Sequence, residues 1–229
     1  MRAIVLGFAA TVIASQALAA DYLRGSTYEV VKPAFRWDGV YFGGQVGYAR
    51  SDATFERTPS FDGVLPADWP ELPSASAGNT SYGAFLGYNA QFGEIVIGAE
   101  ANYSHVSLRN HSSRLFAPFE YTGTTKVTDY GSLRFRAGYA WDWVMPYASV
   151  GLALVRADVR RATELPAGPE IVDFRGGVVS LGYSVGFGVD VALMQNLFVR
   201  GEYEFMQFKG INGSWVNLGT ARGAVAVKF

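Results

Sequence analysis

Cysteine is absent from the 229 residues, so the chain can form neither a disulfide framework nor a thiolate site. Charged residues are also scarce, at 17% against about 25% in an ordinary soluble domain. The formal net charge is −1, and because neither sign dominates, no nucleic acid or other polyanion is indicated as a partner. After the first twenty residues no apolar run is long enough to predict a transmembrane helix.

The first segment of the chain is typical of an export signal. Residues 1–19 combine a positive start at Arg2, an apolar run through Ile13, and a small-residue cleavage site at Ala17-Leu18-Ala19. The alternative, a membrane anchor, fits less well because the run is short and ends at a good cleavage site. We therefore predict a signal peptide over 1–19 and a short periplasmic extension over 20–36.

The chain has no long apolar runs after its first segment, but apolar and polar residues alternate along several stretches. In residues 215–229 every second position from Phe229 back to Gly219 is apolar or small, with Lys228 and Arg222 among the interleaved residues. A period of two predicts a strand with one apolar face. A strand at the end of a sheet is an exposed edge, so we expect this strand to pair with the first one and close a barrel.

Seven further segments show the same alternation, which predicts eight strands in total. They are residues 37–50, 81–92, 95–104, 126–141, 145–156, 177–191 and 197–208. Short turns alternate with long polar loops near 51–80, 105–125 and 157–176. Outer-membrane barrels have this rhythm, with the long loops outside the cell. The predicted fold is all-β, an eight-stranded antiparallel up-and-down transmembrane β-barrel over residues 37–229.

Alternation alone does not say which face of the strands points outward. A soluble barrel such as a lipocalin would turn its apolar face inward. Here the other face is rich in glycine and serine, and its charges are few and balanced: Glu100, Arg134, Arg136, Asp190, Arg200, Glu202, Glu204 and Arg222. Side chains just fill an eight-stranded barrel, and buried charges must pair or meet water. We therefore predict a lumenal ion-pair cluster that plugs a membrane barrel; the alternative is a set of unrelated surface charges.

Aromatic residues are predicted at both ends of the apolar face. Those at the turn side are Phe92, Trp141 and Phe229, and those at the loop side are Tyr48, Tyr82, Tyr103 and Trp215. Two aromatic bands are expected where a lipid-facing surface meets the two membrane interfaces. This arrangement favours the membrane orientation over the soluble one.

The opening of the predicted barrel resembles a known family. Residues 37–48, WDGVYFGGQVGY, follow a short segment beginning Ala20-Asp21, as in the small alphaproteobacterial outer-membrane β-barrel proteins. That group includes major surface antigens and haem-binding surface proteins. The ending Val227-Lys228-Phe229 is similar to the signal by which the barrel-assembly machinery recognises such proteins. The resemblance implies location in the cell outer membrane among its lipids and lipopolysaccharide, and it implies no catalytic activity.

Function is predicted to be structural, with the loops in contact with host or other surface ligands, and no enzyme activity, cofactor or metal is expected. Barrel enzymes acting on acyl chains need a histidine base beside a serine and a carboxylate, and only His105 and His111 are present. Haem binding is one alternative, because imidazole and phenolate ligate iron and His105, His111, Tyr121 and Tyr130 lie in or beside one loop. A diffusion porin is the other, although eight strands leave little lumen.

Overall fold

The computed structural model describes residues 35–55, 58–59, 68–69, 71–116, 119–164, 171–211 and 214–229. The predicted signal peptide and nearly all of the predicted periplasmic extension lie outside these residues. The chain divides into two units, Met1–Pro33 and Ala34–Phe229, and the second contains every element described below. Within the described ranges, no helix has the length and apolar character needed to cross a membrane.

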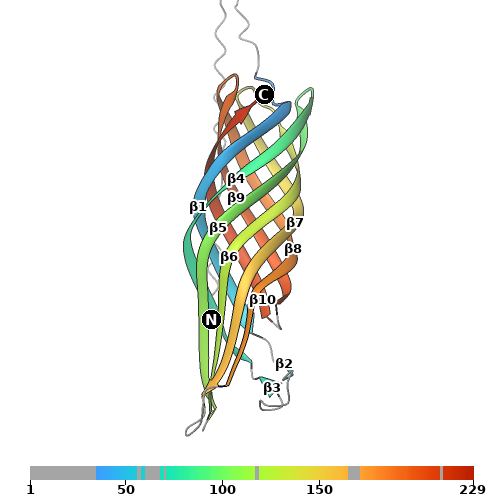
Figure 1. The fold of residues 1–229 in the computed structure, drawn as a ribbon. Coiled ribbons are helices and arrows are strands. Elements are labelled where there is room, and N and C mark those ends of the chain that lie inside the picture. Colours follow the sequence, from blue (N-terminus) through green and yellow to red (C-terminus); the bar gives the residue numbers. More distant parts are fainter. Residues whose placement is uncertain are drawn as a thin grey trace, which may run out of the picture. The chain divides into compact units, whose positions relative to one another are not determined.

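Eight long antiparallel strands form a closed barrel (Figure 1). They are β1 (Gly39–Phe55), β4 (Leu72–Phe92), β5 (Ile95–Phe116), β6 (Phe119–Tyr139), β7 (Val144–Glu164), β8 (Ile171–Met194), β9 (Leu197–Ile211) and β10 (Ser214–Lys228). Two short strands, β2 (Thr58–Pro59) and β3 (Asp68–Trp69), pair separately. Each long strand pairs with its neighbour in the chain, and β10 pairs with β1 from Tyr41↔Lys228 onward. The predicted closure between the first and last strands is confirmed.

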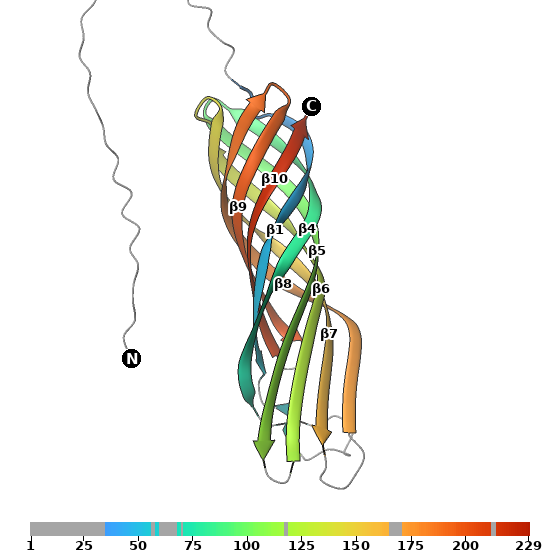
Figure 2. The same cartoon turned by 90° about the vertical axis from the view of Figure 1, so that its left-hand side faces the viewer.

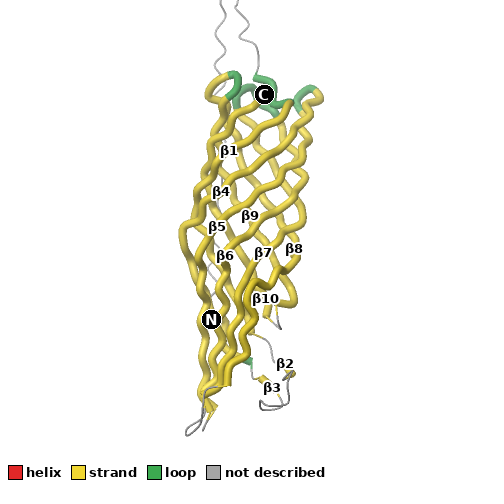
Figure 3. The backbone as a smooth tube through the Cα atoms, viewed as in Figure 1, coloured by secondary structure: helices red, strands yellow, loops and turns green. Residues whose placement is uncertain are grey.

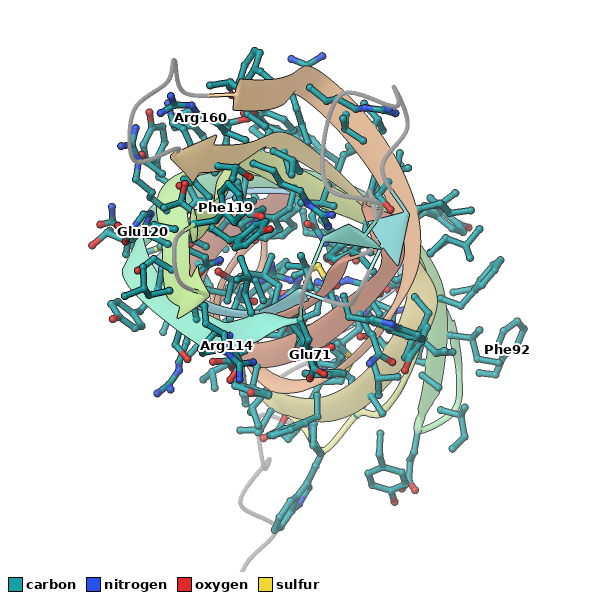
Figure 4. All side chains as sticks on the ribbon, turned by 90° about the horizontal axis from the view of Figure 1, so that it is seen from below. Glu71, Phe92, Arg114, Phe119, Glu120 and Arg160 are labelled. Atoms are coloured by element: carbon teal, nitrogen blue, oxygen red, sulfur yellow. The ribbon has the colours of Figure 1, made fainter. Side chains whose placement is uncertain are left out.

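The apolar face of the barrel wall points outward. Phe135, Leu181 and Val225 are 69%, 59% and 53% exposed, whereas Arg136 and Arg222 are 3% and 6% exposed. Side chains from the surrounding strands point into the ring, as the view along the barrel shows (Figure 4). This orientation is that of a membrane barrel, and the alternative of a soluble carrier with an apolar interior is wrong.

Exposed aromatic side chains lie at both ends of the apolar surface. Phe92, Trp141 and Phe229 are exposed at the end with the short turns, and Tyr48, Tyr82 and Tyr103 are exposed further along the strands. Phe92 projects away from the barrel wall (Figure 4). The C-terminal Phe229 stacks on Phe42 of β1, with ring centroids 5.8 Å apart. These bands are the expected interfacial girdles of a lipid-facing barrel.

The strands are longer than predicted, and much of the three predicted loops is strand. β1 and β4 extend into 51–80, β5 and β6 into 105–125, and β7 and β8 into 157–176. The structure is yellow strand almost throughout (Figure 3), and β5 to β8 continue furthest from the short turns (Figure 2). The polar composition and the prolines of these segments predicted loops. Beyond the lipid, however, the outer face of a strand meets water and can be polar. The backbone N–H and C=O groups there are still paired in the ladder of each hairpin.

Bulges mark the level at which β5 to β8 leave the apolar belt. The register shifts between His105 and Leu108, between Val127 and Asp129, and between Ala157 and Val159. On β6 the bulge reverses the facing of the side chains, because an extra residue breaks the period of two. Val127, predicted on the outward apolar face, is therefore fully buried inside.

The interior has three layers. Next to the short turns lies an apolar and aromatic layer that contains Phe35, Trp37, Tyr41, Phe85, Val96, Met145, Ala192, Phe198, Ala224 and Ala226. At the long-hairpin end lies a second apolar layer, which includes Leu108, Val127, Val155, Phe208 and Leu218. Phe35, near the end of the predicted periplasmic extension, packs edge-to-face on Trp37, with ring centroids 4.6 Å apart. Charged residues occupy the middle layer.

Candidate functional site

The middle layer is a network of eight charged side chains, each 6% exposed or less. Its members are Glu100, Arg134, Arg136, Asp190, Arg200, Glu202, Glu204 and Arg222. These are the eight residues that the sequence placed on the non-apolar face of the strands. Four carboxylates face four guanidinium groups, so their formal charges cancel. We call this set the interior network.

Glu100 of β5 joins both halves of the interior network. Its Oε1 accepts a hydrogen bond from Arg134 Nη2 at 2.5 Å, and its Oε2 accepts one from Arg200 Nη1 at 2.6 Å. The hydroxyl of Tyr41 also donates to Oε2, at 2.8 Å. The carboxylate is therefore bound by groups from three other strands, β1, β6 and β9.

Asp190 of β8 binds the two arginines nearest the aromatic layer. Arg136 Nη2 donates to its Oδ2 at 2.6 Å, and Arg200 Nε donates to its Oδ1 at 2.7 Å. The Arg136 guanidinium carbon lies 3.8 Å from the ring centroid of Tyr147, in cation–π contact. Arg200 approaches the ring of Phe85 in the same way, at 4.7 Å. The network thus packs directly on the aromatic layer.

Glu202 of β9 accepts more of the hydrogen bonds described in the interior network than Glu100 does, five against four. Arg134 donates to both of its oxygens at 2.6 Å, in the bidentate geometry that makes arginine–carboxylate pairs strong. Arg222 Nε donates to Oε1 at 2.9 Å, and the Tyr147 hydroxyl donates to Oε2. Arg222 also donates to the neighbouring Glu204, whose other oxygen accepts from Ser132 Oγ at 2.7 Å. The carboxylates are therefore fully engaged.

Strand periodicity and glycine explain why these groups meet. Arg134 and Arg136 on β6 are two residues apart, as are Arg200 and Glu202 on β9, so each pair shares the inner face. Gly87 lies opposite Tyr41, and Gly188 lies opposite Tyr147. A Cβ atom at either glycine would collide with the facing tyrosine ring. The sequence pattern predicted only the eight charged members, so Tyr41 and Tyr147 are additions from the structure.

The chemistry of the interior network favours stability over reaction. Guanidinium groups stay protonated in proteins, so they do not act as general acids or bases. Each carboxylate is tied to at least one arginine, and apolar layers lie on both sides of the network in the described interior. A network this deeply buried is costly to disrupt, because removing one partner leaves a buried charge unpaired.

The residues of the haem alternative do not converge. His105 and His111 lie six positions apart on the outer face of β5, about 20 Å along a strand. His105 Nδ1 lies 3.0 Å from Asp129 Oδ1, and His111 Nδ1 lies 3.1 Å from Thr124 Oγ1. Tyr121 and Tyr130 instead point into the apolar layer at the long-hairpin end. In the part of the chain that the structure describes, no group of three or more histidine, aspartate or glutamate side chains could hold a metal ion.

Comparison with known proteins shows to which family the chain is similar. The model of the outer membrane protein beta-barrel domain matches residues 6–229. The 25 kDa outer-membrane immunogenic protein of Brucella ovis is 28% identical over 100% of this chain and 96% of its own length. The 31 kDa outer-membrane immunogenic protein of Brucella melitensis is 27% identical over the full length of both chains.

Another curated protein and a solved structure are also described as outer membrane proteins. The 22 kDa outer membrane protein of Rhizobium leguminosarum is 27% identical over 78% of this chain and 68% of its own length. Among solved structures, OprG of Pseudomonas aeruginosa aligns with a TM-score of 0.44 and 12% identity, over 84% of this chain and 97% of that one. With a closed eight-stranded barrel, an apolar outer face and a family match over nearly its whole length, the chain belongs to the outer membrane protein beta-barrel domain family and is a protein of the cell outer membrane.

Proposed function

We propose that this protein is a structural, surface-exposed barrel that supports envelope integrity and makes external contacts through its long hairpins. The observation that carries the proposal is the interior network, held between two apolar layers in the described interior. A barrel filled in this way anchors a surface without opening a path for solutes. The porin alternative is disfavoured for that reason, and the haem alternative because its residues lie apart.

The hairpins of β5 to β8 are the proposed contact surface. In outer-membrane barrels the short turns face the periplasm and the long connections face the exterior. Proposed partners are lipopolysaccharide, host molecules and neighbouring barrels, and Phe229 is the proposed recognition residue for the barrel-assembly machinery. The Brucella relatives are described as outer-membrane immunogenic proteins, which is consistent with exposure of these hairpins at the cell surface.

Two readouts test the proposal together. Deletion of the coding sequence from its source bacterium is expected to increase sensitivity to detergents and leakage of periplasmic proteins, and the wild-type copy is expected to restore both. The purified protein in planar bilayers is expected to give no large, stable conductance steps, with a wide porin as the positive control. Unchanged envelope properties, or stable conductance comparable to that of the porin, would contradict the proposal.

A further inference from the structure

A segment that is not part of any strand fills the end of the barrel with the short turns. Residues 35–38 precede β1, and the side chains of Phe35 and Trp37 are 2% and 1% exposed. Both belong to the apolar layer at that end. Arg36 and Asp38, which alternate with them, have exposed side chains and form an ion pair at 2.9 Å. We call residues 35–38 the latch.

The latch contacts parts of the barrel that lie far apart in the sequence. Trp37 packs edge-to-face on Phe198 of β9, with ring centroids 5.8 Å apart. Its backbone N–H donates to Gln91 Oε1 of β4 at 2.7 Å. The ring of Phe35 contacts that of Trp143, next to the start of β7, with ring centroids 5.8 Å apart. The latch therefore crosses the mouth of the ring rather than continuing β1 along the wall.

The first and last strands also meet at the latch, since β1 begins beside the C-terminus (Figure 1). Lys228 Nζ of β10 donates to the carbonyl oxygen of Asp38 at 2.8 Å and lies 5.5 Å from the ring centroid of Phe35. The backbone N–H of Phe229 donates to the carbonyl oxygen of Val40 at 2.9 Å. The latch is therefore fastened to the seam at which the ring closes.

Gly39 allows the chain to change direction between the latch and β1. Its φ of +119° is a conformation that residues with a side chain rarely adopt. A Cβ atom at Gly39 would also collide with the carbonyl oxygen of Phe229. From Gly39 onward β1 is paired with β4. Gly39 is therefore the hinge between the latch and the backbone ladder of the wall.

The order in which these contacts form follows from the positions of the partners in the chain. They lie on β4, β9 and β10 and beside β7, so all of them are in place only when the ring is complete. Asp38 and Lys228 are 190 positions apart, and closing so long a loop is unfavourable before the strands between them have paired. Contacts that form after the folding transition state slow unfolding and leave the folding rate unchanged.

We propose that the latch is a conformational device that docks last, into the completed ring, and undocks without unfolding of the wall. In the docked state it slows unfolding and covers the apolar layer beside the short turns. In the undocked state this layer is open as far as the interior network, whose ion pairs still close the barrel. Local openings of this kind cost less free energy than global unfolding. The latch needs no external partner and is independent of the contact function proposed above.

The kinetic part of the proposal is tested by folding and unfolding the protein in phospholipid vesicles, with heat-modifiable gel migration as the readout. Trp37→Ala is expected to raise the unfolding rate by at least about 100-fold, because the whole loss of stability falls on unfolding. Its folding rate is expected to stay within about twofold of that of wild type, because the contacts of Trp37 are absent from the transition state.

Undocking itself is measured with a thiol probe, because the chain has no cysteine of its own. Ala226→Cys places a thiol in the layer that the latch covers, at a residue that is 1% exposed. Maleimide is expected to react there at least about 100-fold more slowly than at Glu94→Cys, an exposed short-turn residue. Adding Lys228→Met is expected to speed the reaction at Ala226→Cys about tenfold, since it removes a charged hydrogen bond without opening a cavity.

Matched variants separate undocking from a general loosening of the barrel. Lys126→Met changes a lysine of β6 at the long-hairpin end and is expected to leave the reaction at Ala226→Cys unchanged. Leu218→Cys, in the second apolar layer, is expected to stay protected when Lys228→Met is added. Heat-modifiable migration confirms that each variant is folded.

Three results would overturn the latch. The first is a folding rate of Trp37→Ala that falls by as much as the unfolding rate rises. The second is a reaction at Ala226→Cys that Lys228→Met does not speed in folded protein. The third is equal acceleration at Leu218→Cys, which would mean that the whole interior opens at once.

Discussion

Replacing Glu202 by glutamine is expected to lower the free energy of unfolding by about 3–5 kcal/mol, the usual cost of leaving one side of a buried ion pair without its partner. Glu202 accepts hydrogen bonds from Arg134, Arg222 and Tyr147, and it is almost fully buried. Glutamine keeps the shape but removes the charge, so the interior network acquires an uncompensated positive charge. The measurement is urea unfolding in phospholipid vesicles, followed by heat-modifiable gel migration.

A matched control and a second substitution sharpen that experiment. Glu71→Gln removes an exposed carboxylate near the long-hairpin end (Figure 4) and is expected to change stability by less than about 0.5 kcal/mol. Adding Arg222→Gln to Glu202→Gln restores the charge balance and is expected to recover part of the loss, because contacting groups are coupled. A loss below about 1 kcal/mol for Glu202→Gln would show that water reaches the network, against the sealed interior.

Trp37→Ala is the second change with a large expected effect, a loss of about 3–5 kcal/mol, as for other buried tryptophans cut to alanine. Trp37 is 1% exposed and packs edge-to-face on Phe35 and Phe198. Its backbone N–H donates to Gln91 Oε1 at 2.7 Å, which fixes the entry of the chain into the barrel. Alanine would leave a cavity in the apolar layer beside the short turns. The same vesicle unfolding assay measures the effect.

Trp141→Ala is the matched control, because Trp141 lies 74% exposed at a short turn on the same side of the membrane. Its loss removes interfacial surface but opens no cavity, so the expected change is within about 1 kcal/mol. Equal effects of the two tryptophan substitutions would mean that residues 35–38 do not seal the barrel. Gel migration is preferable to fluorescence here, since both variants change the tryptophan signal.

The membrane-crossing part of the fold could be predicted because its residues obey one simple constraint. Lipid outside the barrel and a narrow interior require apolar and other residues to alternate with a period of two along each strand. The outward facing of Leu181 and the inward facing of Arg222 can therefore be predicted from sequence alone. The same parity placed Arg134 and Glu202 together on the inner face. Chain closure followed from the terminal strand, which would otherwise be an edge.

Beyond the lipid the outer face of a strand need not be apolar, so the alternation that predicts a strand is lost from the sequence. The segment 105–112 carries polar residues on its outer face, and two of its inner residues, Asn110 and Ser112, are polar as well, which resembles a loop when the chain is read in isolation. The bulge at Val127 and Asp129 reverses the facing of β6 without any glycine or proline to mark it. The packing of Phe35 on Trp37 and Trp143 does not follow from local pattern, because it depends on where the other strands place their side chains.

The most direct test of the central claim uses the absence of cysteine, which allows one spin label per molecule at a chosen site. Labels at Phe135→Cys, Leu181→Cys and Val225→Cys in bilayers are expected to collide often with oxygen and rarely with a water-soluble nickel chelate. A label at Arg109→Cys, on the outer face of β5 beyond the bulge, is expected to show the opposite preference. Nickel chelate that reaches the first three sites as readily as Arg109→Cys would place the apolar face in water and contradict the account.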